Sequence, residues 1–96
     1  LTEVSVATPK SRPYGIAMQG IEAVWFTERD ANRLGRFTGP VPPAEFALPT
    51  PNSEPTDLVV DGEGCVWYTA PGANRIGRLC VHNLYTHQQY LPLLSK

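Results

Sequence analysis

The feature that most constrains the fold is an internal repeat with a period of 42 residues. The segment 13–36 returns as 55–78, so that Trp25 and Trp67 hold equivalent positions. A period of 40 to 50 residues built from short strands is typical of β-propeller blades, and one blade cannot bury both of its faces alone. The sequence therefore predicts an all-β chain with two four-stranded antiparallel blades and a leading outer strand.

The repeat also sets the expected organisation of residues 1–96 as one partial propeller. Residues 1–12 form an outer strand and linker, 13–54 the first blade repeat and 55–96 the second. Residues 3–7 align with the fourth strand of a repeat, although no first three strands precede them. We expect them to be the outer strand of a blade whose remainder lies on a missing part of the chain or on another copy. Because no Met precedes Leu1, we expect that end to be cut or processed.

Each repeat contains four short runs rich in β-branched and aromatic residues, separated by turns that contain Pro, Gly or Asn. The expected strands are 15–18, 23–28, 33–37 and 45–48 in the first repeat, and 58–60, 66–70, 75–79 and about 89–91 in the second. The segment 81–87 departs from the template of the first repeat.

Hairpin symmetry predicts which residues face each other across the second and third strands of each repeat. A hairpin centred between Gly72 and Ala73 places Trp67 opposite Arg78, and the same geometry places Trp25 opposite Arg36. An Arg over a Trp ring contributes about 0.5–1 kcal/mol in a partly exposed setting. We interpret both pairs as structural rather than ligand-binding.

The same symmetry places Cys65 opposite Cys80, within disulfide range in a non-hydrogen-bonded pair. The first repeat has Ala23 and Thr38 at these positions, so the two cysteines are not part of the blade template. In a reducing compartment they would remain thiols. The compartment itself stays open.

Composition excludes several classes of protein. A hydrophobic content of 42% argues against disorder. The formal net charge of -1 leaves no basic field for nucleic acid, and no apolar run approaches the length that spans a membrane.

The chain resembles the virginiamycin B lyase family of seven-bladed propellers. The resemblance rests on Trp25-Phe26-Thr27-Glu28, the Arg-Leu/Ile-Gly-Arg segments and Leu48-Pro49-Thr50-Pro51, and it covers the chain up to Leu79. It implies an elimination that opens the ester-closed ring of type B streptogramin antibiotics, with Mg²⁺ polarising a carbonyl and a His acting as general base.

Carrying the family pattern onto these repeats implies an incomplete site. The base position after the Pro that opens an inner strand holds Tyr14 in the first repeat and Thr56 in the second, so no catalytic residue is predicted. Tyr14 matches a Tyr at the substrate mouth. Glu54, just before Pro55, and Glu28, at the end of a second strand, match metal-binding positions. The resemblance thus implies ligand binding by Tyr14 and Glu54, and Mg²⁺ binding by Glu54 and Glu28.

The residues themselves also admit less specific interpretations. Glu28 and Asp30, beside Arg29 and Arg33, have the composition of a surface charge cluster at a hairpin tip. Glu54 is expected in a solvent-exposed loop even if it binds nothing.

Two further segments resemble metal sites only weakly. Residues 61–64 (Asp-Gly-Glu-Gly) look like part of a calcium loop but are too short for one, which favours a tight turn. His82 and His87 lie in the divergent segment, where a solvated loop is the expected role and a metal site the alternative.

Three functions remain open on these observations. The first is a lyase-like propeller unit that binds a small molecule at the central mouth, through Tyr14 and Glu54, without the lyase base. The second is a Mg²⁺-dependent lyase whose site is completed by other copies or missing blades. The third is a protein-interaction module that uses a propeller face. Because two blades expose apolar faces, we expect self-association into a closed ring, or remaining blades on a longer chain.

Overall fold

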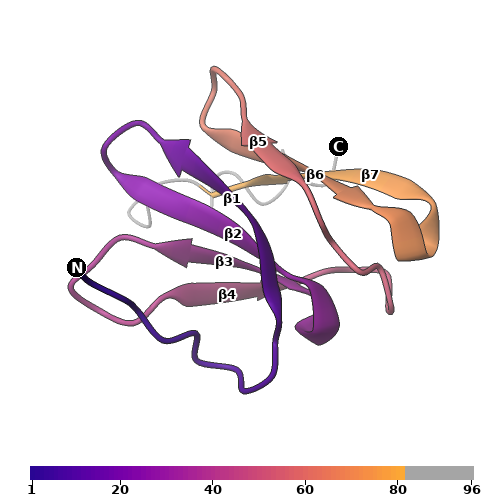
Figure 1. The fold of residues 1–96 in the computed structure, drawn as a ribbon. Helices are drawn as coiled ribbons and strands as arrows, with labels where there is room; N and C mark the ends of the chain where they lie inside the picture. The colour runs from indigo at the N-terminus through magenta and orange to yellow at the C-terminus, as the bar shows by residue number, and fades with distance from the viewer. Residues whose placement is uncertain (82–96) are drawn as a thin grey trace.

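The structure, a computed structural model that describes residues 1–81, contains two antiparallel sheets (Figure 1). The first sheet has the order β1-β2-β3-β4 and the second β5-β6-β7. The strands are β1 (Pro13–Gln19), β2 (Ala23–Glu28), β3 (Arg33–Phe37), β4 (Ala44–Ala47), β5 (Leu58–Val60), β6 (Cys65–Ala70) and β7 (Arg75–Cys80). These bounds confirm the all-β fold. The strand predicted near residues 89–91, and His82 and His87, lie outside the described residues.

Among residues 1–81, no helix has the length and apolar character needed to cross a membrane.

The two hairpin tips have the same conformation in both repeats. A single 3-10 turn, η1 (Arg29–Ala31) or η2 (Pro71–Ala73), is followed by Asn32 or Asn74 in the left-handed region, with φ of 58° and 55°. Asn tolerates this region better than most residues, because its short amide can bond to nearby backbone. These identical tips fix the register of the strands that they join.

The register confirms the predicted Trp–Arg pairs. Trp25 lies opposite Arg36, and Trp67 lies opposite Arg78. Each guanidinium carbon lies over the indole, at 5.6 Å from the ring centre in the first pair and 5.2 Å in the second. The same pair thus braces both sheets.

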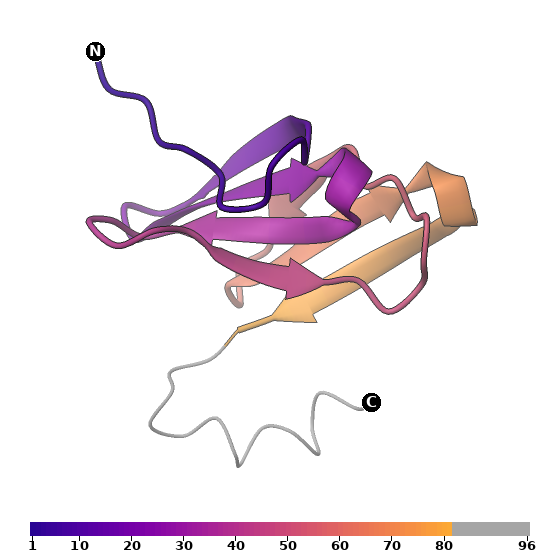
Figure 2. The same ribbon diagram turned by 90° about the horizontal axis from the view of Figure 1, so that it is seen from below.

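The hydrophobic core lies between the two sheets, which pack face to face (Figure 2). Trp25 and Leu34 come from the first sheet, and Leu58, Val66 and Tyr68 from the second. These side chains alternate with outward-facing residues along their strands, as a half-buried sheet requires. The core is therefore an interface between blades and does not lie within either one.

The inner strands β1 and β5 are joined by one buried hydroxyl. The N–H of Gly15 donates to Oγ1 of Thr27 at 2.7 Å, and Thr27 Oγ1 donates to the carbonyl oxygen of Thr56 at 3.0 Å. A Cβ on Gly15 would overlap the Thr56 carbonyl, so only glycine permits this approach. Equivalent ends of the two inner strands consequently lie side by side.

The linkers that lead into the two sheets are held in the same way. Asp30 N–H donates to the carbonyl of Ser11 at 3.0 Å, and Gly72 N–H donates to that of Ser53 at 2.9 Å. Residues 3–7 form no paired strand within the described part of the chain. Their role as an outer strand stays a prediction.

The two cysteines form a disulfide between the facing strands of the second sheet. Cys65 on β6 pairs with Cys80 on β7, and the two Cα atoms lie 4.3 Å apart. This separation is that of a non-hydrogen-bonded pair, where side chains approach most closely. The bond therefore follows from the predicted register.

We expect Thr27→Val to lower the free energy of unfolding by about 1–3 kcal/mol, because it leaves the partly buried Gly15 N–H and Thr56 C=O without their hydrogen-bond partner. Thr69→Val is the matched control, since Thr69 is the equivalent threonine but is exposed. Urea unfolding monitored by tryptophan fluorescence measures both. Equal losses for the two variants would mean that the hydroxyl of Thr27 has no special role between the sheets.

We expect loss of the disulfide to lower the free energy of unfolding by about 3 kcal/mol, because the bond closes a loop with a sequence separation of 15. The variant Cys65→Ala/Cys80→Thr takes the residues that the first repeat has at Ala23 and Thr38. Urea unfolding compares it with the parent under oxidising and reducing conditions. The reductant should destabilise only the parent, and an effect on both would contradict the assignment.

Candidate functional site

Tyr14 lies at the beginning of the inner strand of the first sheet. It is the second residue of β1, and its side chain is 62% exposed. The guanidinium carbon of Arg29 lies 5.8 Å from the centre of its ring. Because Gly15 packs against Thr56, Tyr14 stands at the same end of the sheets as the start of the next repeat. Its ring is a fixed aromatic surface that a ligand can contact.

Glu54 precedes Pro55 in the linker to β5 and is exposed, as predicted. Its backbone is in the left-handed region, with φ of 52°. A Cβ placed on Gly72 would come 3.0 Å from the Glu54 Cγ, so the side chain lies against the hairpin tip of the second sheet. Tyr14 instead lines a groove on the first sheet together with Ile16 and Phe26. The two predicted ligand-binding side chains thus start neighbouring inner strands but have different surroundings.

Glu28 corrects the prediction of a surface charge cluster. Its side chain is 0% exposed, and neither carboxylate oxygen accepts a hydrogen bond. Burial, followed by the neighbouring carboxyl of Glu45, raises the pKa of Glu28 to about 8, against a smaller opposing effect of Arg33. A charged carboxylate is costly to bury, which keeps Glu28 protonated at neutral pH. Only Asp30 behaves as predicted, forming an exposed ion pair with Arg12 at 2.9 Å.

Glu45 carries the negative charge of this carboxyl pair. The hydrogen bond with Glu28, then those from Thr8, lower its pKa, while partial burial opposes them. Thr8 Oγ1 donates to Glu45 Oε1 at 2.7 Å, and Arg33 Nη1 lies 3.2 Å from the same oxygen. A proton held on Glu28 is thus matched by an ionised Glu45. Sequence analysis missed this pair, because Glu45 lies far along the chain, on β4.

The residues predicted to bind Mg²⁺ do not form a magnesium site in the described part of the chain. Magnesium takes about six oxygen ligands in octahedral geometry. Glu28 shares its surroundings with Glu45 and Arg33, whereas Glu54 lies against Gly72. A protonated carboxyl and an exposed carboxylate with different neighbours do not supply that set.

A third side chain completes each Trp–Arg pair at the far end of the inner strand. In the first sheet Gln19 Oε1 accepts from Trp25 Nε1 at 2.9 Å. In the second sheet Asp61 Oδ2 accepts from Trp67 Nε1 at 2.9 Å and from Arg78 Nη2 at 3.1 Å. These contacts support a structural role. Sequence analysis missed the acceptor, although Gln19 and Asp61 are equivalent in the repeat.

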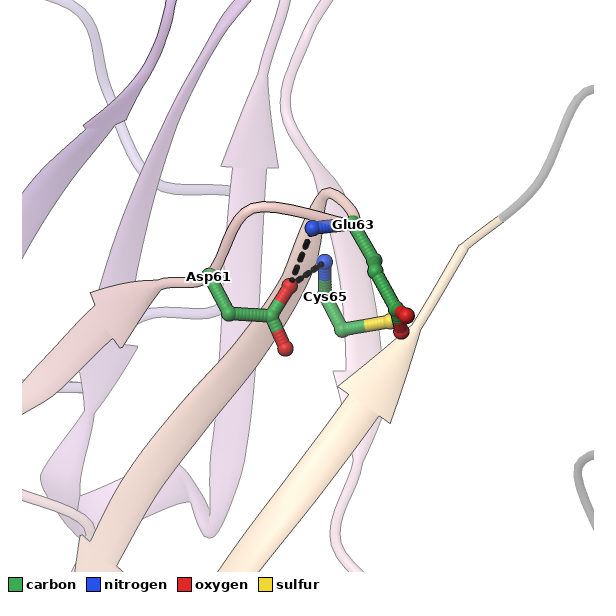
Figure 3. A group of neighbouring side chains, drawn as sticks. All are labelled: Asp61, Glu63 and Cys65. Carbon is green, nitrogen blue, oxygen red and sulfur yellow. Dashed lines mark hydrogen bonds between the residues drawn. The ribbon is translucent and has the colours of Figure 1, made fainter.

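Asp61, Glu63 and Cys65 lie close together, with one candidate ligand atom of each within 4.8 Å of the others (Figure 3). However, the Cys65 sulfur is bonded to Cys80 and is not a thiolate. Asp61 Oδ1 accepts from the backbone N–H of Glu63 at 2.8 Å and of Cys65 at 3.0 Å. The hydrogen bond from Trp67, then those from these backbone N–H groups, lowers the pKa of Asp61 to about 2, against partial burial. The segment is a tight turn, as predicted.

The repeated sheets, with β1 beside β5 and the core between them, define part of a β-propeller. The model of the virginiamycin B lyase family matches residues 1–92. The chain therefore belongs to the virginiamycin B lyase family.

Individual relatives agree with this assignment. The chain is 45% identical to virginiamycin B lyase of Bacillus licheniformis over 38 residues, which cover 40% of this chain and 13% of that protein. A streptogramin B lyase structure matches 80% of this chain and 26% of its own, with 36% identity and a TM-score of 0.76. Selenomethionine-substituted virginiamycin B lyase from Staphylococcus aureus matches 86% and 28%, with 40% identity and a TM-score of 0.78.

A third structure is a catalytically inactive variant of the Staphylococcus aureus lyase with quinupristin, at 40% identity and a TM-score of 0.76 over 86% of this chain and 28% of that chain. The chain thus spans about a quarter of the solved lyase chains that it matches.

We expect Glu28→Gln to flatten the pH dependence of stability. The folded-state pKa of Glu28 is raised above the unfolded value, so the folded chain binds more protons between about pH 4.5 and 8. The free energy of unfolding of the parent should therefore fall across this window, at up to about 1.4 kcal/mol per pH unit. Urea unfolding at pH 5 and pH 8 measures the slope. An unchanged slope in the variant would contradict a buried proton on Glu28.

Proposed function

We propose that this chain is a ligand-binding unit of a lyase-like β-propeller and does not itself supply the lyase base. Membership of the family and the match to part of its propeller support the proposal. The carrying observation is Tyr14, an exposed aromatic ring at the start of an inner strand, which Arg29 holds in place. The central mouth is the end of the propeller where inner strands begin, and Glu54 lies at the next such start.

A base is missing from both inner strands that are described. The position after the opening Pro is occupied by Tyr14 in β1 and by Thr56 before β5. The threonine hydroxyl meets Thr69 Oγ1 at 3.0 Å, and no described acidic or basic side chain hydrogen-bonds to it. Histidine is the side chain that most often serves as a general base near neutral pH, and neither position holds one. Turnover by this unit would need residues from outside the described part of the chain.

The side chains of Tyr14 and Glu54 at the proposed mouth indicate the class of ligand. Aromatic and apolar ligands stack on a half-exposed Tyr, and the polar tip of the ring and Glu54 can orient amides. Quinupristin is the compound held by the inactive Staphylococcus aureus lyase that matches this chain. It is therefore the probe of choice.

We expect the chain to bind quinupristin, and Tyr14→Ala to weaken binding at least tenfold by removing the ring. Tyr14→Phe is the matched control and should weaken it less, because the ring and its contact with Arg29 remain. Glu54→Ala should weaken binding more than Glu63→Ala, an exposed glutamate at the opposite end of the second sheet. Isothermal titration calorimetry measures the affinity of the parent and of the four variants for quinupristin.

If neither Tyr14→Ala nor Glu54→Ala changes the affinity for quinupristin, the proposed site is wrong. Ring opening of quinupristin with added Mg²⁺, followed by mass spectrometry, tests the lyase alternative on the same samples. Activity that appears in the parent would overturn the absence of a base.

A further inference from the structure

Equivalent residues of the two sheets differ sharply in exposure. Trp25 and Leu34 of the first sheet are both 0% exposed, because the second sheet covers them. Their equivalents Trp67 and Ile76 are 42% and 74% exposed. Within residues 1–81, the second sheet thus leaves uncovered the face that the first sheet buries.

The first sheet has the opposite uncovered face. Leu58 and Val60 of the second sheet pack into the core, whereas their equivalents Ile16 and Met18 are 72% and 60% exposed. The free face of the second sheet therefore resembles the face that the first sheet buries at the internal interface. The free face of the first sheet resembles the face that the second sheet buries there. The two free faces are complementary to each other, and neither is complementary to itself.

Residues 3–7 already stand beside the free face of the first sheet. Val4 and Val6 line a groove of about 560 Å³ together with Ile16 and Phe26. Further along, the linker residue Ser11 is tied to the hairpin tip of the first sheet as Ser53 is tied to that of the second. The position of residues 3–7 relative to the first sheet therefore resembles the position of β4 relative to the second sheet.

We propose that the occupant of these faces is a second copy of this chain, joined head to tail. In one copy the outer edge of β7, which pairs with no strand among residues 1–81, takes residues 3–7 of the next copy as its fourth strand, and the two free faces pack on each other. This inference does not depend on ligand binding. The known pairing of β3 with β4 sets the register, in which Ile76 faces Val4 and Gly77 faces Glu3 as Leu34 faces Phe46 and Gly35 faces Glu45.

The charges agree with this register. Arg33 on β3 pairs with Glu45 on β4 at 3.2 Å. The equivalents are Arg75 on β7 and Glu3 in the N-terminal segment, both of which are exposed. Head-to-tail pairing brings these opposite charges together.

The hairpin tip supplies a second matching contact. Asn32 Nδ2 donates to the Thr50 carbonyl at 2.9 Å, and Asn32 Oδ1 accepts from Ser53 N–H at 2.9 Å. The equivalent tip residue is Asn74. Its amide would donate to the Thr8 carbonyl and accept from the Ser11 N–H of the second copy. Asn74 has the same left-handed backbone as Asn32, so its amide is presented in the same way.

One position requires the second interface to be looser than the first. Gly15 touches Thr56 so closely that a Cβ would overlap its carbonyl, and the equivalent of Gly15 is Asp57. The inner strands of neighbouring copies must therefore lie further apart than β1 and β5. The outer strand and the apolar faces hold the copies together.

Two single variants test the pairing, because each removes one side of it. Ile76→Lys places a charge on the accepting edge, and Val4→Lys places one on the donated strand. Both residues are exposed in the single chain, so the fold should be retained, which circular dichroism checks. Ile21→Lys is the matched control, at a fully exposed turn away from both faces.

We expect the parent and Ile21→Lys to associate as the concentration rises. Ile76→Lys alone and Val4→Lys alone should remain at the monomer mass of 10.6 kDa. An equimolar mixture of Ile76→Lys and Val4→Lys should form a dimer and nothing larger, because only one intact interface is available. Sedimentation equilibrium without ligand measures these masses. A monomeric parent, or a mixture that stays monomeric because the β7 edge is already taken, would overturn the proposal.

Asp57→Gly should strengthen the association between copies, whereas Ile76→Lys and Val4→Lys should weaken it. It removes the Cβ that keeps the inner strands of two copies apart, so association should tighten by at least several-fold. Gly72→Ala is not a suitable control, because a Cβ there would meet the Asn52 carbonyl within the chain. Asp57→Ala keeps the Cβ and loses the charge, and it should not tighten association as Asp57→Gly does. Equal affinities for the two variants would contradict the predicted close approach.

Discussion

The contact on which the rest of the structure depends is the approach of β1 to β5 through the hydroxyl of Thr27. This group accepts from Gly15 and donates to Thr56, so it satisfies two partly buried backbone groups at the edge of the core. With the inner strands fixed, the rest of each sheet diverges from them and leaves room for large side chains between. Trp25 and Tyr68 fill that space. The polar contact thus sets the geometry, and apolar burial supplies most of the stability.

A repeat protein of this kind has no core of its own within a repeat. Among residues 1–81, each sheet is covered on one face only, because these residues form one interface between two sheets. Nearest-neighbour contacts dominate the stability of such arrays, so the terminal units are the least supported. Trp67 and Ile76 are exposed because no other sheet formed by residues 1–81 covers them. The chain spans about a quarter of the solved lyase chains that it matches.

Much of the fold could be predicted from the sequence, because short-range geometry determines it. A hairpin tip of fixed length sets the register, and the register places Trp67 against Arg78 and Cys65 against Cys80. Burial could not be predicted in the same way. Glu28 follows an apolar strand and precedes a charged tip, which reads as surface, yet the fold covers it completely and sets it against Glu45. The relevant neighbour lies two strands away, and no local pattern encodes that distance.

The differences between the repeats matter more for chemistry than their likeness. Positions that both repeats share, such as the Trp–Arg pair, stabilise the blades. Positions that differ are free to acquire a function: Tyr14 stands where the second repeat has Thr56, and Glu28 where it has Ala70. An aromatic ring at an inner-strand start costs the fold little, because it lies outside the core. Burying a carboxyl is costly even when it is protonated, and the hydrogen bond that Glu28 makes with ionised Glu45 offsets part of that cost. In a protein built from copies of one unit, a site can arise only where that unit has stopped repeating.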